Sequence, residues 1–210
     1  MPHRVPKSVL WFNVAYLGAS FVAAAVLANG EFLFYCVVSL ILLGIGYVAH
    51  RRVGFTRLTL WCLSGWGLFH MLGGLVPIPT GRWADSARAT PTLYNLWLIP
   101  GALRYDHIMH AFGFGVMTYV SYQGLNAIAG RRGAGVFPTA GVLLLCVMSS
   151  LGFGATNELV EFAATLMMES TGVGDFNNLG FDLVANTAGA VAVAVMIRLT
   201  HQRSRGPLKT

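Results

Sequence analysis

The stretch FLFYCVVSLILLGIGYVA, residues 32–49, is the part of the chain that most clearly indicates its fold class. It contains no charged side chain, and a helix of this length would be about 27 Å long at about 1.5 Å per residue. A bilayer core of about 30 Å needs roughly 20 apolar residues to be crossed by a helix. We therefore interpret residues 32–49 as a transmembrane helix.

Five further apolar runs of comparable or greater length surround this one. They cover residues 8–28, 58–76, 108–128, 136–168 and 180–199. The six runs together predict an all-α fold, a polytopic membrane bundle of six transmembrane helices that forms a single transmembrane domain over residues 1–210. The first run follows basic residues as a secretion signal does, but it is longer than the usual core of about 7–15 residues, so we expect it to be retained.

Two segments need separate treatment. The run 136–168 is too long for one ordinary crossing, so it must tilt, protrude or break, and we expect a break to fall at Gly152 and Gly154, because glycine weakens a helix. Residues 79–105 carry Trp83, Tyr94 and Trp97, and such rings suit the headgroup region. We expect this segment to be an interfacial outer segment with at most one short helix.

The composition excludes several classes of protein. Hydrophobic residues make up 55% of the chain and charged residues 10%, whereas soluble domains carry about 25% charged residues. The net charge of +6 could suggest nucleic acid, but the basic residues lie in short clusters between apolar runs. We therefore expect membrane lipids as partners and no nucleic acid, and the oligomeric state stays open. The three cysteines each lie inside an apolar run, so no disulfide or thiolate metal site is predicted.

The basic clusters also predict the orientation, because Lys and Arg are enriched on the cytoplasmic side. If both termini are cytoplasmic, most of the 14 Lys and Arg residues lie inside. All eight acidic residues then fall in outer loops or outer helix ends, which the rule does not require. They are Glu31, Asp85, Asp106, Glu158, Glu161, Glu169, Asp175 and Asp182.

Helical spacing groups several of these acids with histidines. Asp106 and His110 are four residues apart, as are Asp182 and Asn186, and Glu158 and Glu161 are three apart. Each pair therefore shares one helix face. An ionisable side chain inside the membrane costs about 2.5–3.5 kcal/mol on insertion scales, so such residues normally pair, line water or bind a ligand.

We interpret these residues as a candidate metal-dependent site. The candidate catalytic residues and metal ligands are His70, Asp106, His110, Glu158, Glu161 and Asp182. Imidazole and carboxylate together suit Zn, Fe or Mn, and neighbouring carboxylates repel unless a divalent metal ion or protons neutralise them. The supporting residues that we expect around them are Tyr105, His107, Asn157, Asp175 and Asn186. Arg104 could meet an anionic headgroup.

Simpler interpretations exist for single members of this set. Asp106 and Asp182 lie at helix starts, where acids act as caps and interact favourably with the helix dipole. His70 could be a hydrogen-bonded histidine of the core. Only the shared depth of the whole set favours a site.

Three short motifs resemble the VanZ-like family of small bacterial membrane proteins and a related group of predicted bacterial membrane proteins. They are Asp106 with His110, Glu158 with Glu161, and Asp182-x-x-x-Asn186-x-x-Gly189, within residues 105–197. VanZ-like members commonly carry glutamine at the position of Glu161 and a basic residue at that of His107. The resemblance implies a multi-pass protein of the bacterial cytoplasmic (inner) membrane with a role in the cell envelope.

The sequence therefore leads to three functional hypotheses. The first is a membrane-embedded metal-dependent enzyme, a hydrolase or transferase acting at the outer leaflet on a lipid or lipid-linked envelope substrate. The second is a proton- or cation-coupled transporter or an ion-binding membrane protein, and a transporter would need polar groups in the inner half of the helices as well. The third is a structural accessory subunit in which the polar cluster only joins helices.

Overall fold

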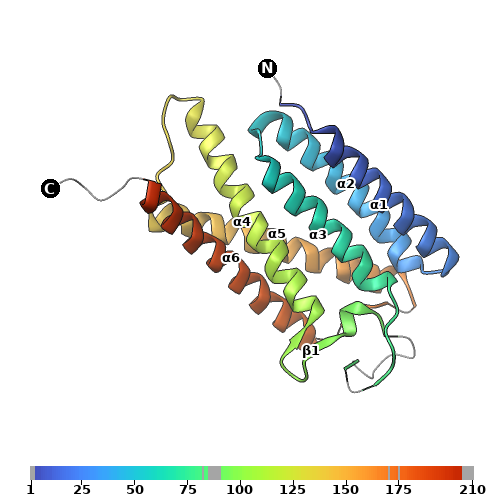
Figure 1. Cartoon of the computed structure of the whole chain (residues 1–210). Coiled ribbons are helices and arrows are strands. Elements are labelled where there is room, and N and C mark those ends of the chain that lie inside the picture. Colours follow the sequence, from blue (N-terminus) through green and yellow to red (C-terminus); the bar gives the residue numbers. More distant parts are fainter. Residues whose placement is uncertain (1–2, 82, 85–90, 170, 175, 205–210) are drawn as a thin grey trace.

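The computed structural model describes residues 3–81, 83–84, 91–169, 171–174 and 176–204. Within these residues the chain folds into six long helices (Figure 1). They are α1 (Lys7–Val26), α2 (Gly30–Val53), α3 (Arg57–Leu75), α4 (Tyr105–Gly130), α5 (Ala140–Met167) and α6 (Phe176–Ser204). Each helix contains most of one of the six apolar runs predicted from the sequence.

The helix boundaries follow from capping residues rather than from the ends of the apolar runs. The side chains of Asn29, Thr56 and Thr139 accept hydrogen bonds from backbone N–H groups in the first turns of α2, α3 and α5. These bonds satisfy N–H groups that have no partner inside the helix. Gly54 ends α2 with φ of 77°, a left-handed conformation that glycine adopts without steric strain.

The fifth apolar run is not broken at Gly152 and Gly154, so that prediction was wrong. α5 continues through both glycines for 28 residues, about 42 Å at about 1.5 Å per residue. A Cβ atom on Gly154 would lie 2.8 Å from Nδ2 of Asn186 in α6. This glycine therefore provides room for a neighbouring helix instead of ending its own.

The outer segment folds back onto the helices. It contains a single helical turn, η1 (Leu93–Asn95), and a two-stranded antiparallel hairpin of β1 (Trp97–Ile99) and β2 (Leu103–Arg104). The hairpin was not predicted. A Cβ atom on Gly73 of α3 would lie 2.6 Å from the ring of Tyr94, so this ring packs on a helix. Residues 82 and 85–90 of this segment, with Asp85, lie outside the described residues.

α4 lies at the centre of the bundle, in contact with α2, α3, α5 and α6. Its most extensive contact is with α6, where the two backbones approach closely. A Cβ atom on Gly189 would overlap the carbonyl of Ala111, and one on Gly115 would lie 3.1 Å from the carbonyl oxygen of Gly189. Small residues allow this approach, as they do in other membrane helix pairs.

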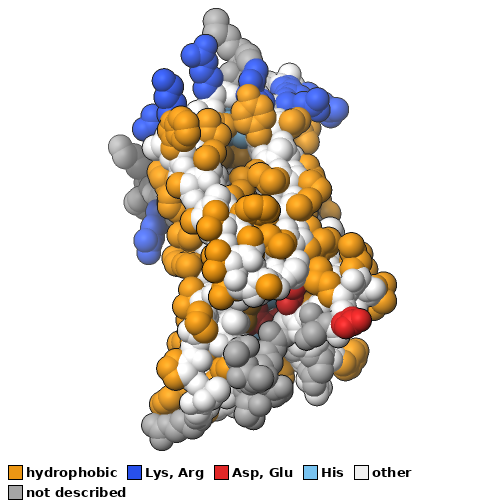
Figure 2. All heavy atoms as spheres, turned by 90° about the vertical axis from the view of Figure 1, so that its right-hand side faces the viewer, with side chains coloured by type: hydrophobic (Ala, Val, Ile, Leu, Met, Phe, Trp, Pro, Cys, Tyr) orange, Lys and Arg blue, Asp and Glu red, His pale blue; other side chains and the backbone are white. Residues whose placement is uncertain are grey.

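Five of the six helices are long and apolar enough to cross a membrane: α1, α2, α3, α5 and α6. Large hydrophobic side chains are exposed along them, and Figure 2 shows such side chains over the flank of the molecule. In the same view most Lys and Arg side chains lie near the top and the visible Asp and Glu lie lower. The structure therefore has a wide apolar belt between a basic and an acidic region.

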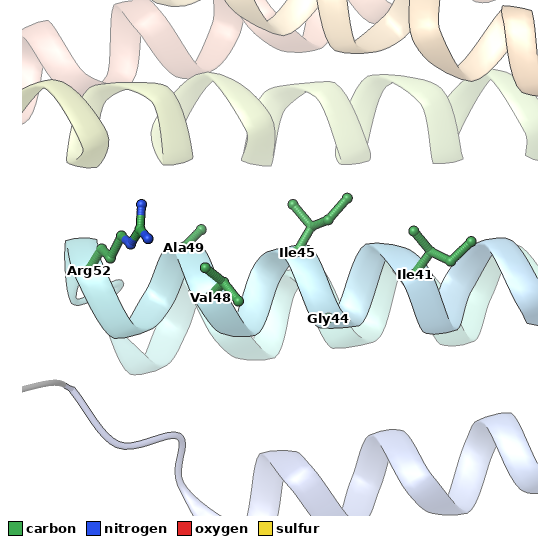
Figure 3. A pocket seen from close by; sticks show the side chains of 6 residues that line it. All are labelled: Ile41, Gly44, Ile45, Val48, Ala49 and Arg52. Atoms are coloured by element: carbon green, nitrogen blue, oxygen red, sulfur yellow. The ribbon is translucent and has the colours of Figure 1, made fainter.

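An open groove runs along the exposed face of α2 (Figure 3). It has a volume of about 570 Å³. Its lining residues are Ile41, Gly44, Ile45, Val48, Ala49 and Arg52. Only Arg52, at the basic end of the helix, interrupts an apolar lining that suits lipid chains.

Candidate metal centre

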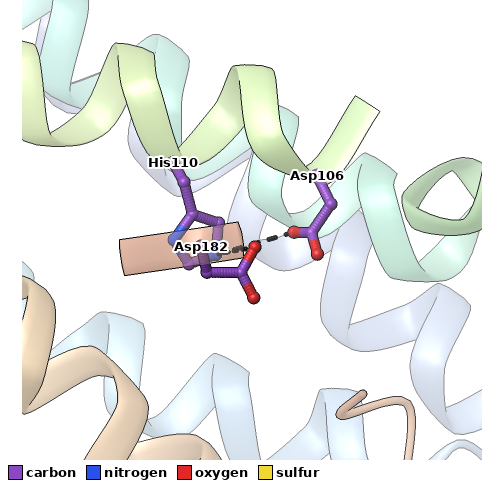
Figure 4. Close-up of side chains that lie close together, drawn as sticks. All are labelled: Asp106, His110 and Asp182. Atoms are coloured by element: carbon purple, nitrogen blue, oxygen red, sulfur yellow. Dashed lines mark ion pairs between the residues drawn. The ribbon is translucent and has the colours of Figure 1, made fainter. Parts of the chain in front are cut away.

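Three helices bring acidic side chains to His110. Asp106 and His110 are one turn apart at the start of α4, and Asp182 is in the second turn of α6. Nε2 of His110 lies 3.6 Å from Oδ1 of Asp106 and 3.8 Å from Oδ1 of Asp182 (Figure 4). The potential ligand atoms of these three residues all lie within 4.8 Å of one another. Small side-chain movements would bring them around one cation.

A second group of ligand atoms shares the same histidine. Glu158 and Glu161 project from α5, and Oε1 of Glu158 lies 3.9 Å from Nδ1 of His110. The ligand atoms of His110, Glu158 and Glu161 again lie within 4.8 Å of one another. We call the five residues Asp106, His110, Glu158, Glu161 and Asp182 the acid–histidine cluster.

Three amide side chains hold the cluster in place. Nδ2 of Asn157 donates to Oε1 of Glu161 at 2.7 Å, and Nδ2 of Asn178 donates to Oδ2 of Asp182 at 2.5 Å. Oδ1 of Asn186 lies 3.0 Å from Nδ1 of His110. Metal-binding histidines and carboxylates usually have such hydrogen-bonded partners, which fix the orientation of the ligand.

Some buried atoms in and beside the cluster lack a hydrogen-bond partner. Among the described residues, Oε1 of Glu158, Oδ1 of Asp182 and Nδ2 of Asn186 accept or donate no hydrogen bond. Asp182 and Asn186 are completely buried. An unsatisfied buried polar atom costs roughly 1–3 kcal/mol, and both carboxylate oxygens lie near His110. A cation bound between either oxygen and the nearer imidazole nitrogen would satisfy that oxygen.

The charges of the cluster favour the same interpretation. Up to four carboxylates surround a single imidazole, and carboxylates at this separation repel each other strongly away from bulk water. A divalent cation or bound protons would remove that repulsion. In the described part of the chain the carboxylate oxygens and the imidazole form a mixed oxygen and nitrogen set, which Zn, Fe and Mn all accept.

His70 lies outside both groups of ligand atoms. The hydroxyl of Tyr94 forms a hydrogen bond with Nδ1 of His70, and the ring of Tyr35 lies edge-on at 5.5 Å. Burial, with Asp106 and Glu161 nearby, raises the pKa of Tyr94 well above its usual value. This hydroxyl therefore stays protonated and can donate to His70.

The remaining predicted residues lie at the edge of the cluster. The hydroxyl of Tyr105 donates to the carbonyl of Phe69 at 2.9 Å. Nδ1 of His107 accepts from the backbone N–H of Arg104 at 3.3 Å, so His107 caps α4. Cζ of Arg104, a buried residue, lies 5.3 Å from the Trp97 ring centre. Asp175 lies outside the described residues.

Sequence reasoning missed Asn178 and the position of Tyr94. Asn178 precedes Asp182 by four residues, so the same helical spacing that selected Asn186 could have selected it. Tyr94 gave no such signal, because its contact with His70 depends on how the outer segment folds back onto α3.

A family model described as Predicted membrane protein (DUF2238) matches residues 9–203. The chain belongs to this family. No curated protein matches the chain, and no solved structure does.

The match to DUF2238 extends across all six helices and supports a membrane-embedded protein. This agrees with the resemblance to a group of predicted membrane proteins that the sequence motifs indicated. The VanZ-like resemblance, which rests on motifs in residues 105–197, stays a prediction.

Proposed function

We propose that this DUF2238 protein is a membrane-embedded metal-dependent enzyme. It would be a hydrolase or transferase that acts on a lipid or lipid-linked envelope molecule at the outer leaflet of a bacterial cytoplasmic membrane. One observation carries the proposal: two groups of buried or partly buried carboxylates, from α4, α5 and α6, converge on His110. This arrangement provides several oxygen ligands and one nitrogen ligand in a place that water enters poorly.

The proposed topology has six crossings and cytoplasmic termini. α4 is not among the five helices that qualify by length and composition. It is enclosed by α2, α3, α5 and α6, so its polar side chains need not face lipid. The clustering of Lys and Arg at one end supports placing that end in the cytoplasm, which puts the acid–histidine cluster in the outer half of the membrane.

The residues of the cluster have separate roles in this proposal. Asp106 and Asp182 at Nε2 of His110, or Glu158 and Glu161 in the second group, would hold an ion together with this imidazole, and the ion would activate a water or polarise a carbonyl or phosphoryl oxygen. Asn157, Asn178 and Asn186 keep these ligands in position. Arg104 supplies a positive charge at the outer end of α4, where an anionic headgroup would enter. The VanZ-like motifs support an envelope substrate.

The proposal is tested by metal analysis of protein purified without any chelator. Wild type is expected to contain a stoichiometric amount of Zn, Fe or Mn, and His110→Ala and Glu161→Ala are expected to lose most of it. Glu169→Ala, which changes an exposed acid outside the cluster, is the matched control and should keep the metal. Metal-free wild type would refute the proposal.

Two outcomes would instead favour the other functional classes. Ion flux in proteoliposomes that depends on the cluster carboxylates would favour a transporter. Cluster variants that all misfold would favour a structural role. Variants that stay folded but lose metal support the enzyme.

A further inference from the structure

A small cavity lies where α3, η1, α4 and α5 meet. The space within it that the centre of a water molecule can occupy is about 10 Å³. Its polar lining residues are His70, Tyr94, His110 and Asn157, and its apolar walls include Trp66 and Phe114.

The size and the lining of this cavity fit one water molecule. A buried water needs roughly 10–15 Å³ of such volume and two to four polar partners. Four of the lining residues carry polar groups, whereas an apolar cavity of this size would stay dry.

The cavity adjoins the acid–histidine cluster directly. His110 belongs both to the cavity wall and to both groups of ligand atoms. Asn157 lines the cavity and donates its hydrogen bond to Glu161. A water in the cavity would therefore lie beside a cation held by His110, Glu158 and Glu161.

The hydrogen bond between Tyr94 and His70 bears on whether His70 can donate a hydrogen bond to such a water. The hydroxyl of Tyr94 and Nδ1 of His70 form a hydrogen bond, and with the hydroxyl as donor the neutral imidazole carries its proton on Nε2. His70 is therefore a hydrogen-bond donor toward an oxygen atom, and Tyr94 fixes this tautomer. Such second partners commonly fix the tautomer of a histidine in metal sites.

We propose that this cavity is the open coordination position of the metal centre and holds one exchangeable water, oriented by His70 and Asn157, with Tyr94 as a positioning residue. The inference rests on the proposed function, since it needs a bound ion. Catalytic metal sites keep a position for water or substrate, whereas structural sites are closed by protein ligands. The cavity thus favours catalysis over a structural metal.

The test counts exchangeable water on Mn(II) bound to the full-length protein in detergent. Electron spin-echo modulation in D₂O is expected to show one deuterated water ligand in wild type. His70→Phe, which fills the cavity and removes the donor, is expected to lose this signal completely while Mn(II) affinity changes by less than about threefold. His70→Gln, which keeps a donor, is expected to retain it.

Two tyrosine variants separate positioning from general effects. Tyr94→Phe removes the hydroxyl that holds His70 and is expected to weaken the deuterium signal. Tyr105→Phe is the control, because Tyr105 bonds to the Phe69 carbonyl and does not line the cavity, and it should leave the signal unchanged.

The results distinguish the two proposals. Wild type that fails to bind Mn(II), Zn(II) or Fe(II) overturns the metal centre and this inference with it. Wild type that binds Mn(II) without an exchangeable water, or His70→Phe that keeps the full signal, overturns only the open coordination position.

Discussion

Replacing Asp182 with asparagine is expected to have different effects on stability with and without metal. Asp182 is completely buried, accepts a hydrogen bond from Asn178 through Oδ2, and directs Oδ1 toward His110. Asparagine has nearly the same shape, and its Oδ1 can still accept from Asn178. The substitution Asp182→Asn therefore removes a charge and a metal ligand but leaves the packing and this hydrogen bond in place.

The size of the effect follows from the distances in the cluster. The ligand oxygens of Asp106 and Asp182 lie within 4.8 Å of each other. Two unit charges at that distance repel by about 3.5 kcal/mol at an effective dielectric constant of about 20. Without metal, Asp182→Asn is therefore expected to equal wild type in stability or to exceed it by up to about 3 kcal/mol. With metal at about 100 times its dissociation constant, wild type gains about 2.7 kcal/mol, and the variant should gain far less.

Unfolding in detergent, followed by heat or denaturant, measures both states. Wild type and Asp182→Asn are compared in a chelator and then in excess Mn(II), Zn(II) or Fe(II). Glu169→Gln serves as the control, since it removes an exposed acid outside the cluster and should respond to metal as wild type does.

Two results would refute this reasoning. One is an equal metal-induced stabilisation of Asp182→Asn and wild type, which would show that Asp182 is not a ligand. The other is a loss of stability of the same size in chelator and in metal, which would show that the carboxylate has a purely structural role.

Two further predictions concern the bundle. Gly189→Ala places a methyl group against the carbonyl of Ala111, so it is expected to lower the free energy of unfolding by about 1–3 kcal/mol. Gly124→Ala, at a site with open space, should be neutral or stabilise by up to about 1 kcal/mol. Thermal unfolding of both variants in detergent measures the difference. Equal midpoints would contradict the close approach of α4 and α6. In a cysteine-free background, an impermeant maleimide added to spheroplasts is expected to label Glu169→Cys and to leave Arg132→Cys unlabelled until lysis, and the reverse pattern would overturn the orientation.

The helices could be predicted from the sequence because their signal is local. A run of apolar residues such as 32–49 indicates a membrane helix whatever its neighbours are. The break expected at Gly152 and Gly154 failed because propensity was considered without tertiary packing. Gly154 faces Asn186, so the structure uses the missing side chain for an interhelical contact.

The cluster could be predicted only in part. Spacing places Asp106 and His110 on one helix face, but it does not say which other face they meet. That depends on the close approach of α4 and α6 at Gly189, a contact between residues far apart in sequence. The contact between His70 and Tyr94 depends on how the outer segment folds back onto α3, and that segment carries no periodic pattern.

The enclosed position of α4 has a consequence for how the protein enters the membrane. As the segment emerges during synthesis it carries Asp106, Tyr105 and two histidines in its first two turns, and ionisable residues within a membrane segment oppose its partitioning into lipid. α5 and α6, which provide most of the surface that shields it, are made later. In the proposed six-crossing topology we therefore expect α4 to integrate stably only after the helices that follow it, so that assembly of this bundle depends on the order of synthesis.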